Sequence, residues 1–219
     1  MDEVSRAVDF RPRSPGRAQS HLTAGELGPH HRLMLNLWHD LPAGLHVPEC
    51  VTAVVEIPSG SRNKYELDKA SGMLKLDRVL FSAVHYPGDY GFIPRTLHED
   101  GDPLDVLVLV KEETFPGCQI DVRPIGVLKM LDRGEPDDKI LGVPLHDPFQ
   151  QEYFDIADIS PHVLNEVEHF FRTYKDLEGK RVEIIGWGKS DEATRIVLES
   201  IERYEATYGS KRELRSTKG

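Results

Sequence analysis

The sequence has little cysteine and no long apolar run, and both absences exclude whole classes of protein. Cys50 and Cys118 are the only cysteines among 219 residues, too few for a disulfide scaffold or a cysteine-rich zinc module. No apolar run exceeds about half a dozen residues, whereas a membrane-spanning helix needs about 20. The first residues include acids and form no apolar leader, and no Asn-x-Ser/Thr acceptor occurs. We therefore expect a cytoplasmic protein with no membrane partner.

Basic residues are outnumbered, and the deficit lies in the middle of the chain. Lys and Arg number 27 against 37 Asp and Glu, which gives a formal net charge of −10. Residues 1–20 carry +1 and residues 210–219 carry +3, so the remainder carries −14. A body this acidic repels polyanions. The sequence therefore disfavours nucleic acid as a partner, and any anionic ligand would need metal ions beside it.

The two ends differ from the middle in composition. Residues 1–35 are rich in Pro, Gly, Ser, Arg and His, residues 209–219 are polar, and neither segment has a hydrophobic period. Because such segments bury no core, we expect two flexible tails around one folded domain at 36–208.

The first part of this domain is rich in short β-branched and apolar runs that end near Gly, Pro or Asp. The expected strands are Cys50–Ile57, Asn63–Leu67, Met73–Leu76, Leu104–Val110, Ile120–Pro124, Gly126–Met130 and Ile140–Val143. Short strands separated by turn residues predict a small closed β-barrel.

The last part of the domain changes to a helical period. Ser160 and Pro161 are typical of a helix start, and apolar side chains then recur at steps of three and four. After a strand at Arg181–Trp187, a second amphipathic helix is expected, with Ser190 or Asp191 as its cap. Strands followed by helices predict an α+β domain with flanking C-terminal helices.

Carboxylates are densest between Glu99 and Asp105, just before an apolar strand. Pro103 favours an extended Asp102, so Asp100 and Asp102 project to one side. Crowded carboxylates repel one another unless hard divalent cations such as Mg²⁺ lie between them. A solvated acidic turn is the commoner explanation of a lone Asp-Gly-Asp run. An EF-hand loop is excluded, because its sixth residue would be Asp105 instead of Gly.

Other ionisable residues and phenols recur near the expected strands. Asp132 and Asp137 precede Lys139 between two strands, and Glu56 stands in an apolar strand. Alone, Glu56 is more often an exposed edge residue, but inward-facing charges on several strands are costly unless they form a site. Lys, Arg and Tyr are the donors that a phosphate group needs. Candidates of this kind are Lys64, Arg78, Lys139, Lys175, Tyr86, Tyr90 and Tyr174.

Several short motifs occur together in one order. The acidic segment contains Asp-(small)-Asp-Pro-(apolar)-Asp-(apolar) in full at Asp100–Val106. The accompanying stretches are Val55–Pro58, Lys64–Asp68, Asp77–Arg78, Tyr86–Gly91, Val127–Asp132, Asp137–Lys139 and Phe170–Lys175. Through nearly all of 36–206 the chain resembles the family I soluble inorganic pyrophosphatases. Arg133 is a departure, because many bacterial members carry an acid there.

The resemblance implies a fold, a reaction and cofactors. The fold would be an OB-like barrel of about five main strands with flanking helices. The reaction would be hydrolysis of diphosphate to two orthophosphates with several Mg²⁺ per active site, Mn²⁺ or Zn²⁺ being possible substitutes. Both hexamers and dimers occur in the family, and the Gly179–Tyr204 segment favours a homo-hexamer.

The resemblance also implies the metal ligands. Asp100, Asp105 and Asp137 would bind a first cation, with Asp105 bridging to a second. Asp132 would join Asp137 around cations that arrive with the substrate, and Glu56 would support a further ion.

The remaining implied roles concern water and phosphate. Asp102 would be the general base, and Lys64 and Tyr90 would hold the phosphoryl group under attack. The leaving phosphate would be held by Arg78, Tyr174 and Lys175, with Lys139 nearby and with Glu66 and Tyr86 supporting the others from behind.

Two other functions are compatible with parts of this pattern. A non-catalytic OB-like module for nucleic acid would want a basic groove with stacking aromatics, which the acidic body disfavours. A divalent-cation buffer would explain the carboxylates but not the Lys, Arg and Tyr side chains. Phosphate release from diphosphate distinguishes an enzyme from both.

The composition of residues 1–35 leads to a first prediction. Because no motif residue lies there, a chain that begins at Leu33 should keep its activity. Turnover of the shortened and full-length chains, each checked for folding by circular dichroism, provides the test. A large loss of turnover with the fold intact would contradict it.

Overall fold

The computed structural model describes residues 35–209. The expected tails at 1–35 and 209–219 therefore lie outside the described residues, apart from their innermost positions. Within the described part of the chain, no helix has both the length and the apolar character needed to cross a membrane.

Five strands form a closed ring, as expected from the sequence. They are β1 (Val51–Ile57), β4 (Asp89–Phe92), β5 (Asp105–Val108), β8 (Lys139–Pro144) and β6 (Gln119–Asp132). Each pairs with the next in that order, and β6 pairs back to β1. The β5–β8 pair is parallel and the others are antiparallel. The predicted five-stranded barrel is confirmed.

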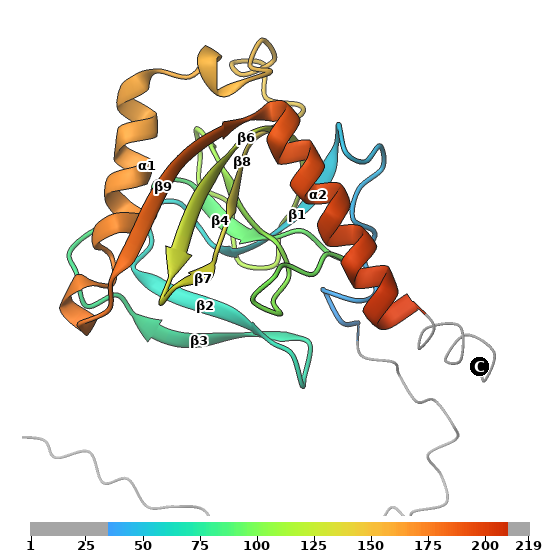
Figure 1. The fold of residues 1–219 in the computed structure, drawn as a ribbon, viewed down its shortest axis with the longest axis horizontal. Helices are drawn as coiled ribbons and strands as arrows, with labels where there is room; N and C mark the ends of the chain where they lie inside the picture. Colours follow the sequence, from blue (N-terminus) through green and yellow to red (C-terminus); the bar gives the residue numbers. More distant parts are fainter. Residues whose placement is uncertain (1–34, 210–219) are drawn as a thin grey trace, which may run out of the picture. The chain divides into compact units, whose positions relative to one another are not determined.

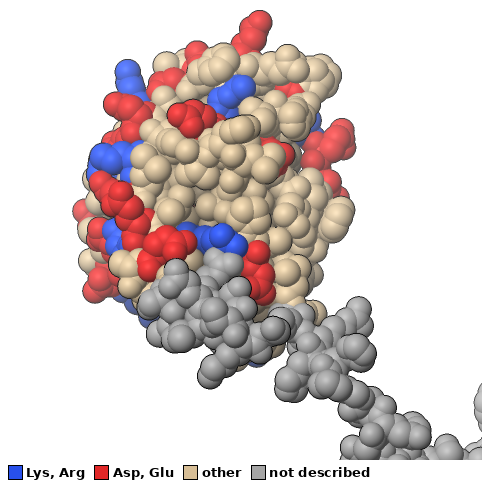
Figure 2. Space-filling model, turned by 90° about the vertical axis from the view of Figure 1, so that its right-hand side faces the viewer, with Lys and Arg blue, Asp and Glu red and all other residues tan. Residues whose placement is uncertain are grey.

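The other strands and the helices surround this ring. The strands are β2 (Asn63–Asp68), β3 (Met73–Val79), β7 (Glu135–Pro136) and β9 (Val182–Lys189). The helices are α1 (Pro161–Thr173) and α2 (Ser190–Tyr204), with short turns η1 (Ile156–Asp158), η2 (Asp176–Glu178) and η3 (Glu205–Gly209). In Figure 1, α1 and α2 flank opposite sides of the barrel, and the β2–β3 hairpin lies below β7. On the α2 side, uncharged side chains fill the middle of the face and charged ones lie mainly toward its edges (Figure 2).

Two strand predictions differ from the structure. The runs at Ile120–Pro124 and Gly126–Met130 belong to one strand, β6, which shifts register between Pro124 and Gly126 and so bends without ending. The strand β4 is absent from the predicted strands, because its Asp and Gly residues have low strand propensity. Pairing with β1 and β5 on either side stabilises β4 in spite of that propensity.

The helix starts are partly as predicted. Ser160 is the N-cap of α1 and Pro161 its first residue, but the Ser160 side chain makes no capping bond. The predicted cap of α2 is wrong, since Lys189 is the N-cap and Ser190 already lies in the helix. Both the backbone N–H and the hydroxyl of Ser190 donate to the Asp155 carboxylate at 3.1 Å, which fixes Ser190 from outside the helix.

The apolar faces of the two helices cover different parts of the barrel. From α1, Phe170 and Phe171 pack against Tyr86 and Tyr90 in one core cluster. From α2, residues such as Val197 pack in a second cluster with β1 and β5. The first contact fixes the C-terminal end of α1 beside Tyr90, which brings the residues after that helix to the barrel.

Gly91 of β4 is expected to be essential to ring closure. A Cβ atom there would lie 1.9 Å from the Val54 carbonyl oxygen of β1. Gly91→Ala should therefore lower the free energy of unfolding by about 2 kcal/mol or more. Gly179 has φ +69 and open space around it, so Gly179→Ala should lose only about 1 kcal/mol to backbone strain. Urea unfolding compares the two variants, and equal losses would show that the close approach is unimportant.

Candidate active site

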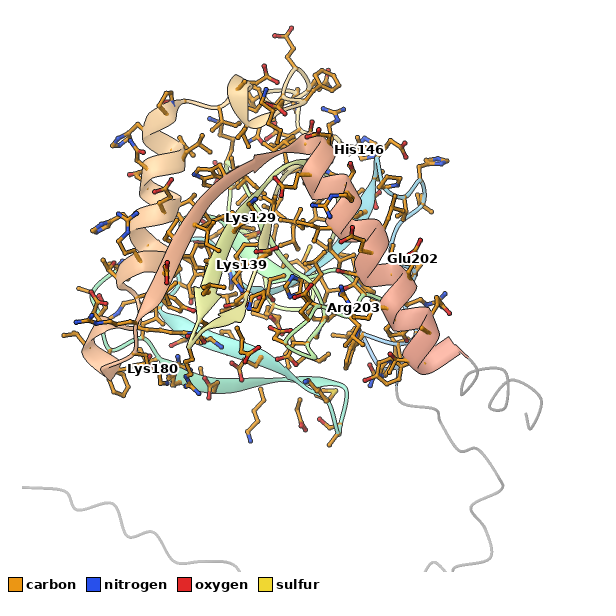
Figure 3. All side chains as sticks on the ribbon, in the orientation of Figure 1. Lys129, Lys139, His146, Lys180, Glu202 and Arg203 are labelled. Atoms are coloured by element: carbon orange, nitrogen blue, oxygen red, sulfur yellow. The ribbon has the colours of Figure 1, made fainter. Side chains whose placement is uncertain are left out.

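A cleft of about 580 Å³ opens where β5 and β8 begin, between the β2–β3 hairpin and the end of α1. It brings together twelve of the fourteen residues singled out in the sequence. They are Glu56, Lys64, Glu66, Tyr90, Asp100, Asp102, Asp105, Asp132, Asp137, Lys139, Tyr174 and Lys175. Figure 3 shows Lys139 in the interior of the domain, whereas Lys180 lies at its edge.

The other two predicted residues do not line the cleft. Tyr86 is 2% exposed and lies behind Tyr90, with the ring centroids 5.3 Å apart. Arg78 lies opposite Lys64 in the β2–β3 ladder, where its Nε donates to Glu178 at 2.9 Å. Tyr86 therefore supports the cleft from the core, and Arg78 stands beside it.

Lys139 is the centre of the polar network. In the parallel β5–β8 register it stands next to Asp105, and its Nζ donates to Asp105 Oδ2 at 2.5 Å and also to Asp137. The Tyr90 hydroxyl donates to the same Asp105 oxygen at 2.6 Å. Lys139 is only 3% exposed, and its buried ammonium group is surrounded by the carboxylates of Asp105 and Asp137 and by the ring of Tyr90.

The charges of this network determine its protonation. Burial opposes the charge of Lys139, but Asp105 and Asp137 outweigh it and raise the lysine pKa, so the ammonium persists. Burial raises the pKa of Asp105, and neighbouring Asp137 adds to that effect. Burial would also raise the pKa of Asp137, but Lys139 lowers it below its ordinary value. One ammonium therefore holds two unequal carboxylates.

Further lysines hold the other acids around the cleft. Lys175 Nζ donates to Asp132 Oδ2 at 2.8 Å, while Asp132 Oδ1 is buried without a hydrogen-bond partner in the structure. Lys64 pairs with Glu66 in the same strand. Each of these lysines is therefore a donor already positioned at an anionic group.

Asp100 and Asp102 lie on the loop before β5. The Asp102 N–H donates to Asp100 Oδ1 at 2.9 Å, and Gly101 between them has φ +85, which glycine adopts without strain. Burial raises the pKa of Asp100, and Asp105 contributes in the same direction. The Asp102 side chain is 52% exposed at the rim of the cleft.

Sequence reasoning missed two residues of this loop's surroundings. Lys69, after β2, forms an ion pair with Asp102. His98 is 6% exposed, with Nδ1 4.0 Å from Asp100 and Nε2 3.8 Å from Asp138. Lys69 directly follows the Lys64–Asp68 motif, but its ion-pair partner Asp102 lies far along the chain. His98 shows no ligand spacing in the sequence, and only the fold reveals its neighbours.

Glu56 is buried in β1, a strand with both faces covered. At 8% exposure it does not behave as an edge residue, and its Oε1 accepts the Leu67 N–H at 2.7 Å. Burial, reinforced by the nearby charge of Asp105, raises the pKa of Glu56 to about 8.

The donor set fits hard divalent cations. Most of the possible cation ligands that line the cleft are carboxylate oxygens, which hard cations prefer. The Asp132 Oδ1 atom is buried and has no hydrogen-bond partner in the structure. Burial and nearby carboxylates raise the pKa of Asp100, and a bound cation would relieve that repulsion. Across residues 35–209, no three His, Cys, Asp or Glu side chains converge as a ready metal cage. In this arrangement, lysines pair with Asp105, Asp137 and Asp132.

The raised pKa of Glu56 predicts a pH-dependent stability. The folded state holds the Glu56 proton up to about pH 8, whereas a glutamate in the unfolded chain loses it near 4.5. Stability is therefore greatest below about pH 4.5 as far as Glu56 is concerned, and it falls progressively from there until the pH has risen through about 8. The loss should be on the order of 5 kcal/mol. Glu56→Gln, which has no proton to lose, should remove this part of the slope.

Urea unfolding in EDTA across this pH range tests the prediction, because no divalent cation then competes for the carboxylate. Glu135→Gln, an exposed glutamate of the same cleft, is the control and should unfold with the wild-type pH dependence. An unchanged slope in Glu56→Gln would show that Glu56 is not responsible.

Comparison with known proteins agrees with this geometry. A family model described as inorganic pyrophosphatase matches residues 53–205. The inorganic pyrophosphatase of Haloferax volcanii is 49% identical over 176 residues, which cover 80% of this chain and 99% of that protein. The soluble inorganic pyrophosphatase of Oryza sativa subsp. indica is 50% identical over 169 residues, or 77% of this chain and 79% of that protein.

A solved structure extends the comparison to the fold. The inorganic pyrophosphatase from Thermus thermophilus superposes with a TM-score of 0.76 at 47% sequence identity, covering 78% of this chain and 99% of that one. Since the family model spans most of the domain and relatives near 50% identity cover most of the chain, the protein belongs to the family I inorganic pyrophosphatases.

Proposed function

We propose that the protein hydrolyses inorganic diphosphate to two orthophosphates with the help of divalent cations, preferentially Mg²⁺. One observation carries the proposal: carboxylates, lysines and phenols from six separate parts of the chain converge on one cleft. Carboxylates suit hard cations, and ammonium and phenol groups suit phosphoryl oxygens. Mn²⁺ and Zn²⁺ are possible substitutes.

The carboxylates divide the work of holding the cations. Asp100, Asp105 and Asp137 would hold the first, with Asp105 shared with a second. Asp132 would join Asp137 for cations that accompany the substrate, and Glu56 would support a further ion. When bound, such cations neutralise phosphoryl charge and lower the pKa of bound water from about 15.7 toward about 7.

The lysines and phenols would bind the substrate. Lys64 and Tyr90 would hold the phosphoryl group under attack, and Tyr174 and Lys175 the leaving phosphate. Lys139 would lie nearby as a buried charge. Burial raises the pKa of Tyr174 well above its ordinary value, so its hydroxyl keeps the proton that it donates to phosphate. The leaving group would thus meet a neutral donor and a cation.

Two residues outside the cleft would contribute indirectly or after a rotamer change. Arg78 is opposite Lys64 in the hairpin ladder and is held by Glu178 and Asp77, so it would reach the leaving phosphate by exchanging those partners. Tyr86 would support the contacting groups from behind, as Glu66 would from within the cleft. Tyr86 does so by packing on Tyr90.

Asp102 would be the general base. Its carboxylate is half exposed at the cleft rim, where water has access, and it is not part of the buried Lys139 network. A base needs both a free lone pair and contact with water. Lys69, as its ion-pair partner, would fix the position of the carboxylate.

The assembly and location form part of the same proposal. We propose a homo-oligomer, with a hexamer favoured over a dimer. The largely uncharged middle of the surface in Figure 2 and the 43% exposure of Leu198 on α2 support a subunit contact. Both cysteines are unpaired in the structure, which supports a cytoplasmic location.

The direct test is release of orthophosphate from diphosphate, measured with Mg²⁺ and with EDTA. Release that requires Mg²⁺ is expected. Cation binding without phosphate release would instead indicate a cation buffer, and retention of single-stranded nucleic acid would indicate a binding module.

The roles of Asp102 and Asp105 predict opposite responses to substitution. Asp102→Asn keeps the shape and the cation ligands but cannot accept a proton, so turnover should fall at least about 100-fold. Its residual rate should rise with pH, because hydroxide then needs no base. Asp105→Asn should instead weaken cation binding, and excess Mg²⁺ should partly restore turnover.

Measuring kcat against pH and against Mg²⁺ concentration for both variants separates the two roles. If Mg²⁺ rescues Asp102→Asn and leaves Asp105→Asn unchanged, the two assignments are reversed.

A further inference from the structure

A second hollow, of about 550 Å³, lies on the other side of the end of β6. It is lined by the β6–β7 turn, by Arg172 of α1, by Arg181 and by the first residues of β9, from Val182 to Ile184. Arg133 in the turn lines both this hollow and the active-site cleft. We call the second hollow the arginine groove, after Arg133, Arg172 and Arg181. The groove and the cleft therefore meet at a single side chain.

The backbone at Arg133 is unusual for an arginine. Asp132 pairs with Glu135, so Arg133 and Gly134 form a two-residue turn, and their φ angles are +55 and +87. Positive φ at both positions is typical of a tight hairpin turn in which Asn, Asp or Gly is preferred first. Arg133, with its long charged side chain, has a left-handed backbone conformation here and lies between the two hollows. Such outliers cluster at functional sites, although Arg95, which lines neither hollow, has a similar φ of +52.

The strand register brings a second guanidinium to the same place. Asp132 pairs with Val182 at the end of the β6–β9 ladder, so Arg133 directly follows β6 and Arg181 directly precedes β9, and both side chains line the groove. Like charges that line one hollow repel each other. Over residues 35–209, neither arginine forms an ion pair with a carboxylate. Two adjacent guanidinium groups thus lack a counter-charge from the described chain.

The rest of the groove favours an anion. Arg172 adds a third guanidinium, held at 3.2 Å by Glu168 one helical turn earlier, and Glu183 is the acid that lines the groove. Leu131, Val182 and Ile184 form its apolar wall. Guanidinium forks match phosphoryl oxygens with two hydrogen bonds each. A basic hollow in a domain this acidic selects small, highly charged anions.

We propose that the arginine groove binds a phosphoryl anion. The anion is either free orthophosphate or the end of a linear polyphosphate that reaches over Arg133 from the cleft. The second source rests on the proposed function of the cleft, whereas the groove itself does not. Arg133 and Arg181 are its principal ligands.

Isothermal titration calorimetry of the full-length protein tests this proposal. The protein is kept in Mg²⁺ with the cleft saturated by methylenediphosphonate, a diphosphate analogue with no hydrolysable bridge. Orthophosphate is titrated into this complex, and tripolyphosphate is titrated separately into protein without the analogue, so that a chain can enter the cleft. Arg133→Ser combined with Arg181→Ser should bind at least about tenfold more weakly than wild type, since charge-assisted contacts are lost. Both positions are exposed, and circular dichroism verifies the fold.

The matched control is Lys111→Ser combined with Arg195→Ser. It removes two charges at exposed positions outside the groove, and its affinity should stay within about twofold of wild type because distant surface charges are screened. Equal weakening in both double variants would overturn the proposal, because net charge alone would then explain it. Absence of any binding by the wild-type protein would also overturn it.

The two probes distinguish the sources of the phosphate group. Loss of orthophosphate binding in the groove variant identifies a site for the free anion, and loss confined to tripolyphosphate identifies a chain that extends from the cleft. If the wild-type protein releases no phosphate from diphosphate, the proposed function fails. The orthophosphate titration still decides the groove.

Discussion

The contact of Lys139 with Asp105 and Asp137 is the interaction on which the site depends. A buried ammonium is unstable without counter-charges, and two neighbouring carboxylates are unstable without a cation. The parallel register of β5 and β8 places Asp105 beside Lys139, and β5 and β8 are neighbours in the closed ring. The ion pair between Asp105 and Lys139 therefore depends on closure of the barrel between β5 and β8. A fold that opened between β5 and β8 would separate Asp105 from Lys139 and leave the buried ammonium with Asp137 alone.

The other polar groups are delivered by elements outside that pair. The β2–β3 hairpin brings Lys64, and the end of α1 brings Tyr174 and Lys175, because Phe170 and Phe171 fix the helix on Tyr86 and Tyr90. Each lysine already holds a carboxylate that would otherwise repel its neighbours. The same lysines are suited to phosphate, so the cleft is stable without substrate and still offers donors to it. Stability of the fold and affinity for phosphate share these side chains.

Sequence reasoning predicts most of the fold and most of the cleft, for identifiable reasons. The helices α1 and α2 and the strand β1 show strong hydrophobic patterns, and the motif Asp100–Val106 marks the acidic loop. The strand β4 has no such pattern, since pairing on both sides forms it. Lys69 and His98 were missed because their importance comes from partners far along the chain or across the fold. Local propensity carries no information about such contacts.

Arg133 shows that the net charge of the chain does not describe the local charge around each hollow. A formal charge of −10 describes the whole chain at long range, where it opposes polyanions. At short range the sign of the charge changes within one residue, from Asp132 in the cleft to Arg133 at the turn between the two hollows. Screening limits each charge to about 8–10 Å, so each hollow is governed by its own lining side chains. An acidic protein can therefore contain a basic groove beside its acidic cleft, and the anions it accepts depend on that local arrangement.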